Sequence, residues 1–224
     1  MDSLVPSVGL GVLHLFCKTA QSFDEDKLIE TIKGIKSEET QIISISILGH
    51  KADFAFMILS KDWVQLRGVQ REISNCGVSI VDSYVSLTEI SEYAAGVPEE
   101  MRNARLYPDL PPSDKRAWCF YPMSKRRNPD QNWFTLGFEK RKELMYEHGA
   151  SGRQFAGRVL QVITGSTGVD DFEWGVTLFC LHPDDLKEVV YTMRFDEASA
   201  EYAEFGPFYS GVVADIKEVL KLSV

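Results

Sequence analysis

Hydrophobic and polar residues follow one another along the first half of the chain in a pattern that predicts alternating strands and helices. The expected elements, in order, are a strand at 10–17, a helix at about 24–36, strands at 41–48 and 52–59, a helix at about 61–76 and a strand at 77–87. The first helix places Leu28, Ile32 and Ile35 on one stripe, as an amphipathic helix requires. This β-α-β-β-α-β order is typical of a ferredoxin-like unit.

The second half of the chain predicts the same order of elements. They are a strand at 117–123, a helix at 135–148, strands at 158–164 and 173–181, a helix at 184–195 and a strand at 208–213. A shift of 120 residues aligns segment 54–73 with segment 174–193 without a gap. Two tandem ferredoxin-like units each leave one sheet face free of helices, and packing these faces together forms a dimeric α+β barrel within one chain. We therefore expect an α+β fold of this kind.

Segment 91–115 separates the two units. It contains one glycine and four prolines and shows no sustained period, which is typical of a linker. We expect a structural N-terminal half over residues 1–100 and a C-terminal half over residues 101–224 that carries the functional site.

The composition is that of an ordinary globular chain of 224 residues, 44% hydrophobic and 25% charged. Thirty-three acidic residues against 24 basic ones give a net charge of −9, which argues against nucleic acid or an anionic membrane as a partner. The apolar runs are too short to span a bilayer, and the N-terminus lacks the features of a signal peptide. The four cysteines lie far apart without CxxC spacing, so we expect reduced thiols in a cytoplasmic protein. The absence of Walker A, GxSxG and HExxH motifs disfavours P-loop, serine-hydrolase and zinc-protease functions.

A basic cluster stands out in this acidic chain. Segment 101–127 contains seven basic residues and only two acidic ones. One interpretation is a solvated surface loop, which is the usual fate of such clusters. The other is a pocket for a ligand with several carboxylates or phosphates, held by arginine and lysine side chains.

One of the four histidines is a candidate metal ligand. The three with adequate structural explanations are His14, His50 and His182. His148 is expected to end a helix, with Gly149 at the left-handed position after it, and to share a face with Leu144 and Met145. A single histidine cannot build a closed zinc site, but it can be the one axial ligand of a haem iron. The alternative is that His148 only interacts with the helix dipole.

The clearest functional signal comes from five segments of the second half. They are 121–127 (YPMSKRR), 144–149 (LMYEHG), 161–166 (QVITGS), 173–179 (EWGVTLF) and 193–199 (MRFDEAS). Together, and in this order, they resemble the peroxide-dependent coproheme decarboxylases of the chlorite-dismutase-like superfamily. The resemblance is close over residues 100–215 and extends to the first half only in architecture. It implies a fold of two ferredoxin-like halves and an assembly that is typically a homopentamer.

The resemblance also implies roles for individual residues. His148 corresponds to the proximal axial ligand of the porphyrin iron, and Gln161 corresponds to the distal residue. Tyr121 and Lys125 correspond to the catalytic tyrosine and its partner lysine. Because residues two apart on a strand point the same way, Tyr121, Met123 and Lys125 are expected to line one pocket wall. The residues expected to bind the substrate are Arg105, Tyr107, Tyr121, Pro122, Met123, Ser124, Lys125, Gln161 and Ser199.

The reaction implied by the resemblance is an oxidative decarboxylation. Its substrate is coproheme (Fe-coproporphyrin III), and hydrogen peroxide drives the conversion of two propionates to vinyl groups, which gives haem b. Tyr121 would form a tyrosyl radical that takes hydrogen from the propionate β-carbon, while Lys125 supplies positive charge. The substrate would thus serve as its own redox cofactor. The implied protein partner is a coproporphyrin ferrochelatase that delivers coproheme.

Three other functions remain open at this stage. A haem-binding carrier or sensor without turnover has no need for Tyr121. A chlorite dismutase requires a distal arginine, where this chain has Gln161. In a purely structural barrel protein, His148 would only be a helix residue and the basic cluster would have no role. Trp133 and Trp174 are expected to be core residues rather than redox sites.

Overall fold

The computed structural model describes residues 2–35, 39–94 and 96–223. The first half contains β1 (Gly11–Thr19), α1 (Glu25–Ile35), β2 (Thr40–Ile47), β3 (Phe54–Ser60), α2 (Trp63–Ser74) and β4 (Val78–Thr88). The strands of the second half are β5 (Ala117–Lys125), β6 (Arg127–Asn128), β7 (Gln131–Asn132), β8 (Val159–Gly165), β9 (Trp174–Cys180), β10 (Ala203–Phe205) and β11 (Tyr209–Val213). Its helices are α3 (Glu99–Leu106), η1 (Trp133–Thr135), α4 (Phe138–Arg153), α5 (Pro183–Met193), α6 (Glu197–Ala200) and α7 (Ile216–Ser223).

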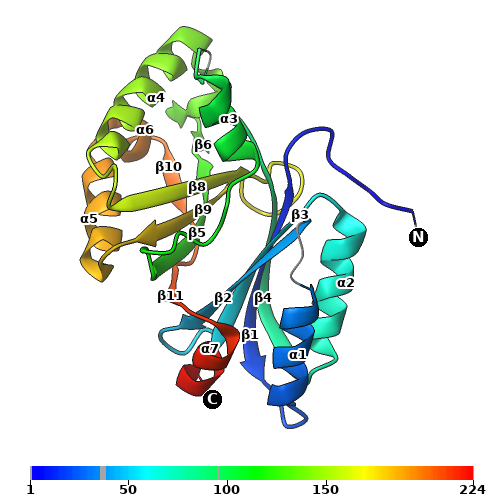
Figure 1. Ribbon diagram of the computed structural model, residues 1–224. Coiled ribbons are helices and arrows are strands. Elements are labelled where there is room, and N and C mark those ends of the chain that lie inside the picture. Colours follow the sequence, from blue (N-terminus) through cyan, green and yellow to red (C-terminus); the bar gives the residue numbers. More distant parts are fainter. Residues whose placement is uncertain (1, 36–38, 95, 224) are drawn as a thin grey trace.

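Nine strands form one large antiparallel sheet in the order β10-β5-β11-β2-β3-β1-β4-β8-β9. An additional pairing of β5 with β9 closes a ring of strands within this sheet. The two halves of the chain are joined in the ring by the β11–β2 and β4–β8 pairings. Figure 1 shows α1 and α2 on one flank of the strands and α4 and α5 on the other. The expected α+β class is confirmed.

The aligned segments of the two halves form equivalent elements. β3 begins at Phe54 and β9 at Trp174, and α2 and α5 begin at Trp63 and Pro183, so each pair starts 120 residues apart. This is the shift that the sequence pattern indicates.

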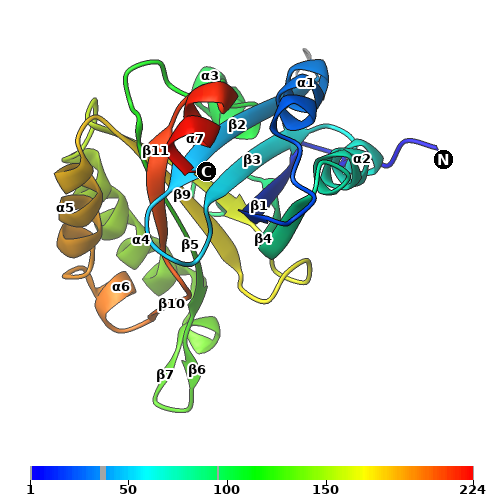
Figure 2. The same ribbon diagram turned by 90° about the horizontal axis from the view of Figure 1, so that it is seen from below.

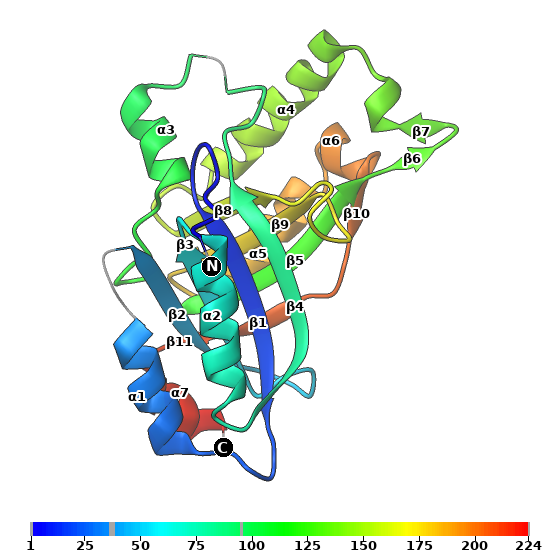
Figure 3. The ribbon, with the colours of Figure 1, turned by 90° about the vertical axis from the view of Figure 1, so that its right-hand side faces the viewer.

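Strand alternation divides the side chains between an interior core and two outer cores. On β5, Trp118 and Phe120 join the interior cluster, which also receives side chains from β1, β2 and β3. Cys119 and Tyr121 point the other way, into the cluster covered by α5. The opposite outer face is covered by α1 and α2 of the first half and by α7 at the end of the second half, as Figure 3 shows. The period of two thus places Tyr121 on the outer face, away from the centre of the ring.

The helix that carries His148 is longer than expected. α4 continues to Arg153, so the prediction that Gly149 ends the helix in the left-handed conformation is wrong. Gly157 is the residue beyond the helix that takes a positive φ, 84°. A Cβ on Gly152 would lie 3.6 Å from Met193 and 3.8 Å from Gln161. These are ordinary van der Waals distances, so α4 packs against α5 and β8 here without requiring glycine, and the backbone reverses at neither Gly149 nor Gly152.

Several further elements were not expected, namely α3, the β6–β7 hairpin, η1, α6, β10 and α7. The predicted linker at 91–115 contains α3, a helix of 8 residues in which only Leu106 is buried. With one buried apolar position, such a helix leaves no period in the sequence. The short β6–β7 hairpin projects from the body of the molecule, as Figure 2 shows. None of the helices in the described residues is long and apolar enough to cross a membrane.

His14 lies inside the ring, on the same face of β1 as Val12 and Phe16. It is 1% exposed, its ring stacks on Phe120 at a centroid distance of 4.2 Å, and its Nε2 lies 3.1 Å from Thr177 Oγ. Burial lowers the pKa of His14 from 6.5 to about 3. The folded protein therefore keeps this imidazole neutral at pH values where the unfolded chain binds a proton.

We expect the unfolding free energy of His14→Gln to decrease less in acid than that of the wild-type protein. The contribution of neutral His14 to folding is complete above the unfolded pKa of 6.5 and is lost progressively as the pH falls toward about 3. Between pH 7 and pH 4 this amounts to about 3 kcal/mol of unfolding free energy. Urea unfolding at both pH values should show a smaller difference for His14→Gln, and an unchanged difference would contradict the assignment.

Candidate functional site

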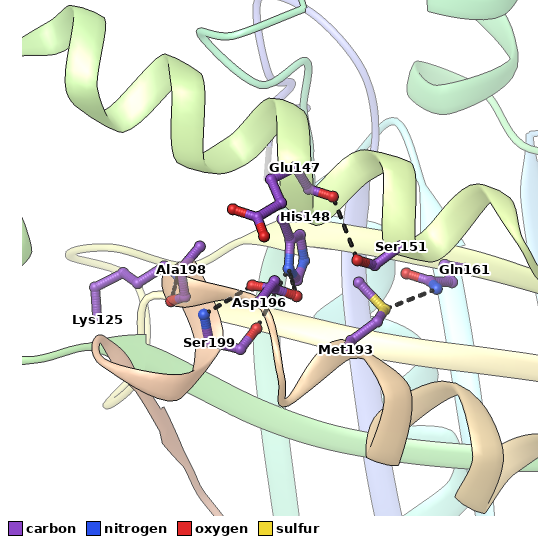
Figure 4. Close-up of polar contacts among 9 residues, drawn as sticks. All are labelled: Lys125, Glu147, His148, Ser151, Gln161, Met193, Asp196, Ala198 and Ser199. Atoms are coloured by element: carbon purple, nitrogen blue, oxygen red, sulfur yellow. Dashed lines mark hydrogen bonds and ion pairs between the residues drawn. The ribbon is translucent and has the colours of Figure 1, made fainter.

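A histidine held by a carboxylate forms the centre of the site. Nδ1 of His148 lies 3.0 Å from Oδ2 of Asp196 and 3.3 Å from Oγ of Ser199. Because an ionised carboxylate only accepts, Nδ1 carries the proton and donates it to Asp196. Asp196 is itself fixed, since its other oxygen accepts the backbone N–H of Ser199 at 2.9 Å and caps α6. Figure 4 shows His148 pointing from α4 toward these two residues.

The sequence around His148 explains this orientation. Leu144 precedes it by one helical turn and is 2% exposed, packed in a cluster with Trp133 and Ala198. Residues four apart lie on the same face of a helix, so burial of Leu144 turns His148 toward α6. Burial alone raises the pKa of Asp196, but hydrogen bonds and charge from His148 and hydrogen bonds from Ser199 lower it on balance.

The His148 ring is suited to ligate a metal through its second nitrogen. Within the described residues the hydrogen bonds of His148 involve Nδ1 and leave Nε2 without a partner. A carboxylate on the far nitrogen is the usual arrangement behind a metal-binding histidine, because it fixes the tautomer and raises ligand basicity. The described residues contain no group of three or more His, Cys, Asp or Glu side chains that could hold a metal ion. The donor set therefore fits an iron whose remaining ligands come from a porphyrin.

Tyr121 lies on β5 in an apolar environment. It is 8% exposed, its ring stacks on Phe208 at 4.4 Å and meets Phe205 edge-on at 5.6 Å. Burial and the nearby Cys119 raise the pKa of Tyr121, and the positive charge of Arg194 opposes them. The phenol is therefore neutral at ordinary pH and retains the hydrogen that a radical reaction would remove.

Lys125 follows on the same strand and is almost completely buried, at 6% exposure. Its Nζ donates a hydrogen bond of 2.6 Å to the carbonyl of Ala198 and lies 4.4 Å from the centre of the Trp133 ring. Burial lowers the pKa of Lys125 from 10.5 to about 8, against the opposing charges of Asp196 and Glu173. Met123, between Tyr121 and Lys125, packs in the same outer core as Tyr121.

Gln161 lies on β8, opposite the C-terminal turn of α4. Its side-chain amide donates to Sδ of Met193 at 3.6 Å. Figure 4 shows Gln161 and Met193 on one side of His148, and Lys125 on the other. His148, Ser199, Lys125 and Gln161 thus belong to one region, formed by α4, α6, β5 and β8.

The remaining expected residues lie further from this region. Alternation along β5 turns Pro122 and Ser124 to the face opposite Tyr121, and Oγ of Ser124 accepts the backbone N–H of Glu173 at 3.2 Å. Arg105 is exposed on α3 and forms no ion pair in the part of the chain that the structure describes. The hydroxyl of Tyr107 accepts the backbone N–H of Gly9 at 3.1 Å. α3 and α4 lie at the same end of the molecule, the upper end in Figures 1 and 3.

Sequence reasoning missed Asp196, which lies 48 positions after His148. Asp196 lies inside segment 193–199, one of the five segments that carry the family resemblance. Its acidic side chain was therefore the feature that could have identified it as a partner of His148. Trp133 is a core residue as expected, although its ring also contacts the lysine. Trp174 was expected to be core but is only partly buried, and its Nε1 donates to Glu89 at 3.1 Å.

Comparison with known proteins assigns the chain to a family. The family model described as chlorite dismutase matches residues 19–214. A coproheme decarboxylase from Staphylococcus carnosus is 46% identical over 75% of this chain and 71% of its own length. A putative heme-binding protein from Natronomonas pharaonis is 45% identical over 83% of this chain, which spans about a third (33%) of that protein.

Solved structures agree with this assignment. A heme-binding protein from Thermus thermophilus is 33% identical, with a TM-score of 0.85 over 98% of this chain and 96% of that one. A mutant chlorite dismutase from Candidatus Nitrospira defluvii has a TM-score of 0.76 over 96% of both chains, and at 17% identity it shows the fold alone. The protein therefore belongs to the chlorite dismutase family.

Proposed function

We propose that this protein is a coproheme decarboxylase, which converts two propionates of Fe-coproporphyrin III to vinyl groups with hydrogen peroxide and gives haem b. The observation that carries the proposal is a carboxylate-held histidine near a buried lysine, together with a neutral, buried tyrosine on the same strand as that lysine. The 46% identity to the Staphylococcus carnosus coproheme decarboxylase supports it.

The side chains of the site would bind and orient the porphyrin. His148 ligates the iron through Nε2, and Asp196 holds its ring in place. Gln161 lies on the distal side, where its neutral amide adds no charge. Met123 and Ser199 are further candidates for contact with the substrate, as are Arg105 and Tyr107. Pro122 and Ser124 would contact it through the backbone, because their side chains face away from Tyr121.

The bound porphyrin iron, once oxidised by peroxide, supplies the oxidising power. Tyr121 gives up its phenolic hydrogen as an electron and a proton, and the tyrosyl radical takes a hydrogen atom from the propionate β-carbon. Release of carbon dioxide and one more electron leaves a vinyl group. Each propionate thus loses two electrons, one proton and carbon dioxide, and each peroxide takes up two electrons and two protons to form two waters. Lys125 places positive charge against the carboxylate and can hold or release a proton near its pKa of about 8.

The architecture that supports this site is a pair of tandem ferredoxin-like units. The orders β2-β3-β1-β4 and β8-β9-β5-β11 within the ring each match a β-α-β-β-α-β unit, and the interior core between them supports a dimeric barrel. The first unit, within 1–100, is structural, and the second, within 101–224, carries the porphyrin site. By the family resemblance, the assembly is a cytoplasmic homopentamer that receives coproheme from a coproporphyrin ferrochelatase.

Two other functions compete with this one. Two relatives are described as heme-binding proteins, so a carrier without turnover is the main alternative. A carrier needs neither the Tyr121 phenol nor Lys125, whose burial with lowered pKa costs stability. Chlorite dismutation is disfavoured because the distal position holds neutral Gln161.

The direct test loads the apoprotein with ferric coproheme and titrates it with hydrogen peroxide while the porphyrin mass is followed. We expect stepwise loss of two carboxyl groups, about one peroxide consumed for each, ending at haem b. Binding followed only by bleaching would instead favour the haem carrier, and chlorite would be the next oxidant to test.

We expect Asp196→Asn to weaken the hold on the iron ligand without removing the ligand. An amide cannot accept the Nδ1 proton as strongly as a carboxylate, so the imidazole becomes a poorer donor to iron. Iron porphyrin affinity should fall about 10–100-fold, and the Fe–His stretching frequency of the ferrous form should decrease. The matched control is Glu197→Gln, at an exposed neighbour on α6. An unchanged stretching frequency in Asp196→Asn would contradict the role of this carboxylate.

A further inference from the structure

The ammonium group of Lys125 is held by two neutral groups. It donates to the carbonyl of Ala198 at 2.6 Å and lies 4.4 Å from the centre of the Trp133 ring. Within the described residues no carboxylate forms an ion pair with it. The nearby carboxylates have other partners, since Glu173 pairs with Arg127 and Asp196 with His148.

This arrangement preserves the charge of the lysine. An ion pair with a buried carboxylate would cancel the positive charge before a substrate arrived. A carbonyl dipole and an aromatic face attract the ammonium group but leave its net charge available. A buried lysine held in this way is suited to meet an incoming carboxylate, such as a porphyrin propionate.

The hairpin between β5 and η1 brings the indole to the lysine. Arg127 pairs with Asn132, and the backbone N–H of Trp133 donates to the carbonyl of Arg126 at 3.0 Å. The chain therefore folds back on itself, so that residue 133 returns beside residue 125. An eight-residue separation in sequence becomes a direct contact through this turn.

The indole is fixed by its own packing. Trp133 is 3% exposed and meets the Tyr202 ring edge-on at 5.4 Å. It shares a cluster with Leu144 of α4 and Ala198 of α6. The elements that hold His148 and its carboxylate thus also fix the ring that faces Lys125.

We propose that Trp133 is a positioning residue that holds the Lys125 ammonium group ready to receive a propionate of the iron porphyrin, an inference that rests on the proposed function. The indole acts through the lysine. Its π face stabilises the charged form of a lysine that burial disfavours. The other titratable groups around this lysine are Asp196, Glu173, Arg127 and Tyr202.

The test measures the Lys125 side chain itself in the apoprotein. Lysine labelled with ¹³C at the ε-carbon is titrated by NMR, and the Lys125 signal is assigned by its absence from Lys125→Met. Trp133→Leu keeps the site dry but removes the π face, so the titration midpoint should fall by about one pH unit. In Trp133→Phe, which has a weaker π face, the Lys125 titration midpoint should fall by less. Trp63→Phe, in the core of the first half, is the control and should leave the midpoint unchanged.

Thermal unfolding shows whether each variant is folded. If Trp133→Leu does not fold, the smaller shift in Trp133→Phe decides the question. An unchanged midpoint in a folded Trp133 variant overturns the proposal.

The pH–rate profile of decarboxylation then tests whether the contact between Trp133 and Lys125 matters for the reaction. In Trp133→Phe the alkaline limb of the pH–rate profile should move to lower pH, with kcat falling more than KM changes. An NMR shift without this movement overturns the role in catalysis. If the wild-type protein binds coproheme but does not decarboxylate it, the proposed function fails, while the NMR titration still decides whether Trp133 holds the lysine.

Discussion

Tyr121→Phe is expected to bind coproheme and to leave all of its propionates intact. The phenol ring is packed between Phe208 and Phe205, and its hydroxyl forms no hydrogen bond within the described residues, so phenylalanine fills the same space. What the substitution removes is the one hydrogen that can leave as an electron and a proton together. Binding measured by the porphyrin absorption spectrum should be nearly unchanged, whereas formation of haem b should be abolished.

The control for this prediction is Tyr191→Phe, at a tyrosine on α5 that is 60% exposed. It should retain full turnover. Rapid-freeze EPR after peroxide addition should detect a tyrosyl signal in the wild-type protein and in Tyr191→Phe, but not in Tyr121→Phe. Full decarboxylation by Tyr121→Phe would eliminate this residue as the radical site.

His148→Ala is expected to remove the protein ligand of the iron. The substitution leaves Asp196, at 1% side-chain exposure, without its partner and opens a space beside it. The affinity for coproheme should fall by at least about tenfold, since loss of even an outer partner of a metal ligand costs that much. The absorption and ferrous resonance Raman spectra should lose the features of a histidine-ligated iron.

Added imidazole provides a sharp check on this assignment. It fits the space left by the side chain and can donate one N–H to Asp196 while the other nitrogen binds iron, so it should restore the histidine-type spectrum. The control is His182→Ala, at the N-cap of α5, which should bind coproheme normally. A wild-type spectrum in His148→Ala without imidazole would show that another residue ligates the iron.

Some features of the fold follow from local pattern alone. The period of two on β1 places His14 on the same face as Val12 and Phe16, and all three are buried. The amphipathic stripe of α1, with Leu28, Ile32 and Ile35, is buried as expected. Such features are predictable because the period of an element decides which face is buried, and the period is written in neighbouring residues.

The end of α4 shows where local reasoning fails. Glycine after a histidine is a common helix stop, yet the helix continues through Gly149 to Arg153. Glycine costs only about 1 kcal/mol in a helix, and the last turns of α4 gain packing against α5 and β8, where Met193 and Gln161 lie next to Gly152. That packing depends on α5 and β8, which lie far along the chain.

The local sequence pattern predicts the order of the main strands and helices and the common face of Tyr121 and Lys125 on β5. The family resemblance supplies the residues expected to provide a ligand, a radical and a charge. Only the tertiary structure decided which groups hold them: Asp196 behind His148, and Trp133 with the Ala198 carbonyl around Lys125. The physical reason is that periodicity reports burial along one element. The partner of a buried polar group is instead chosen by the packing of several elements, since each such group must find a donor, acceptor or aromatic face somewhere in the fold.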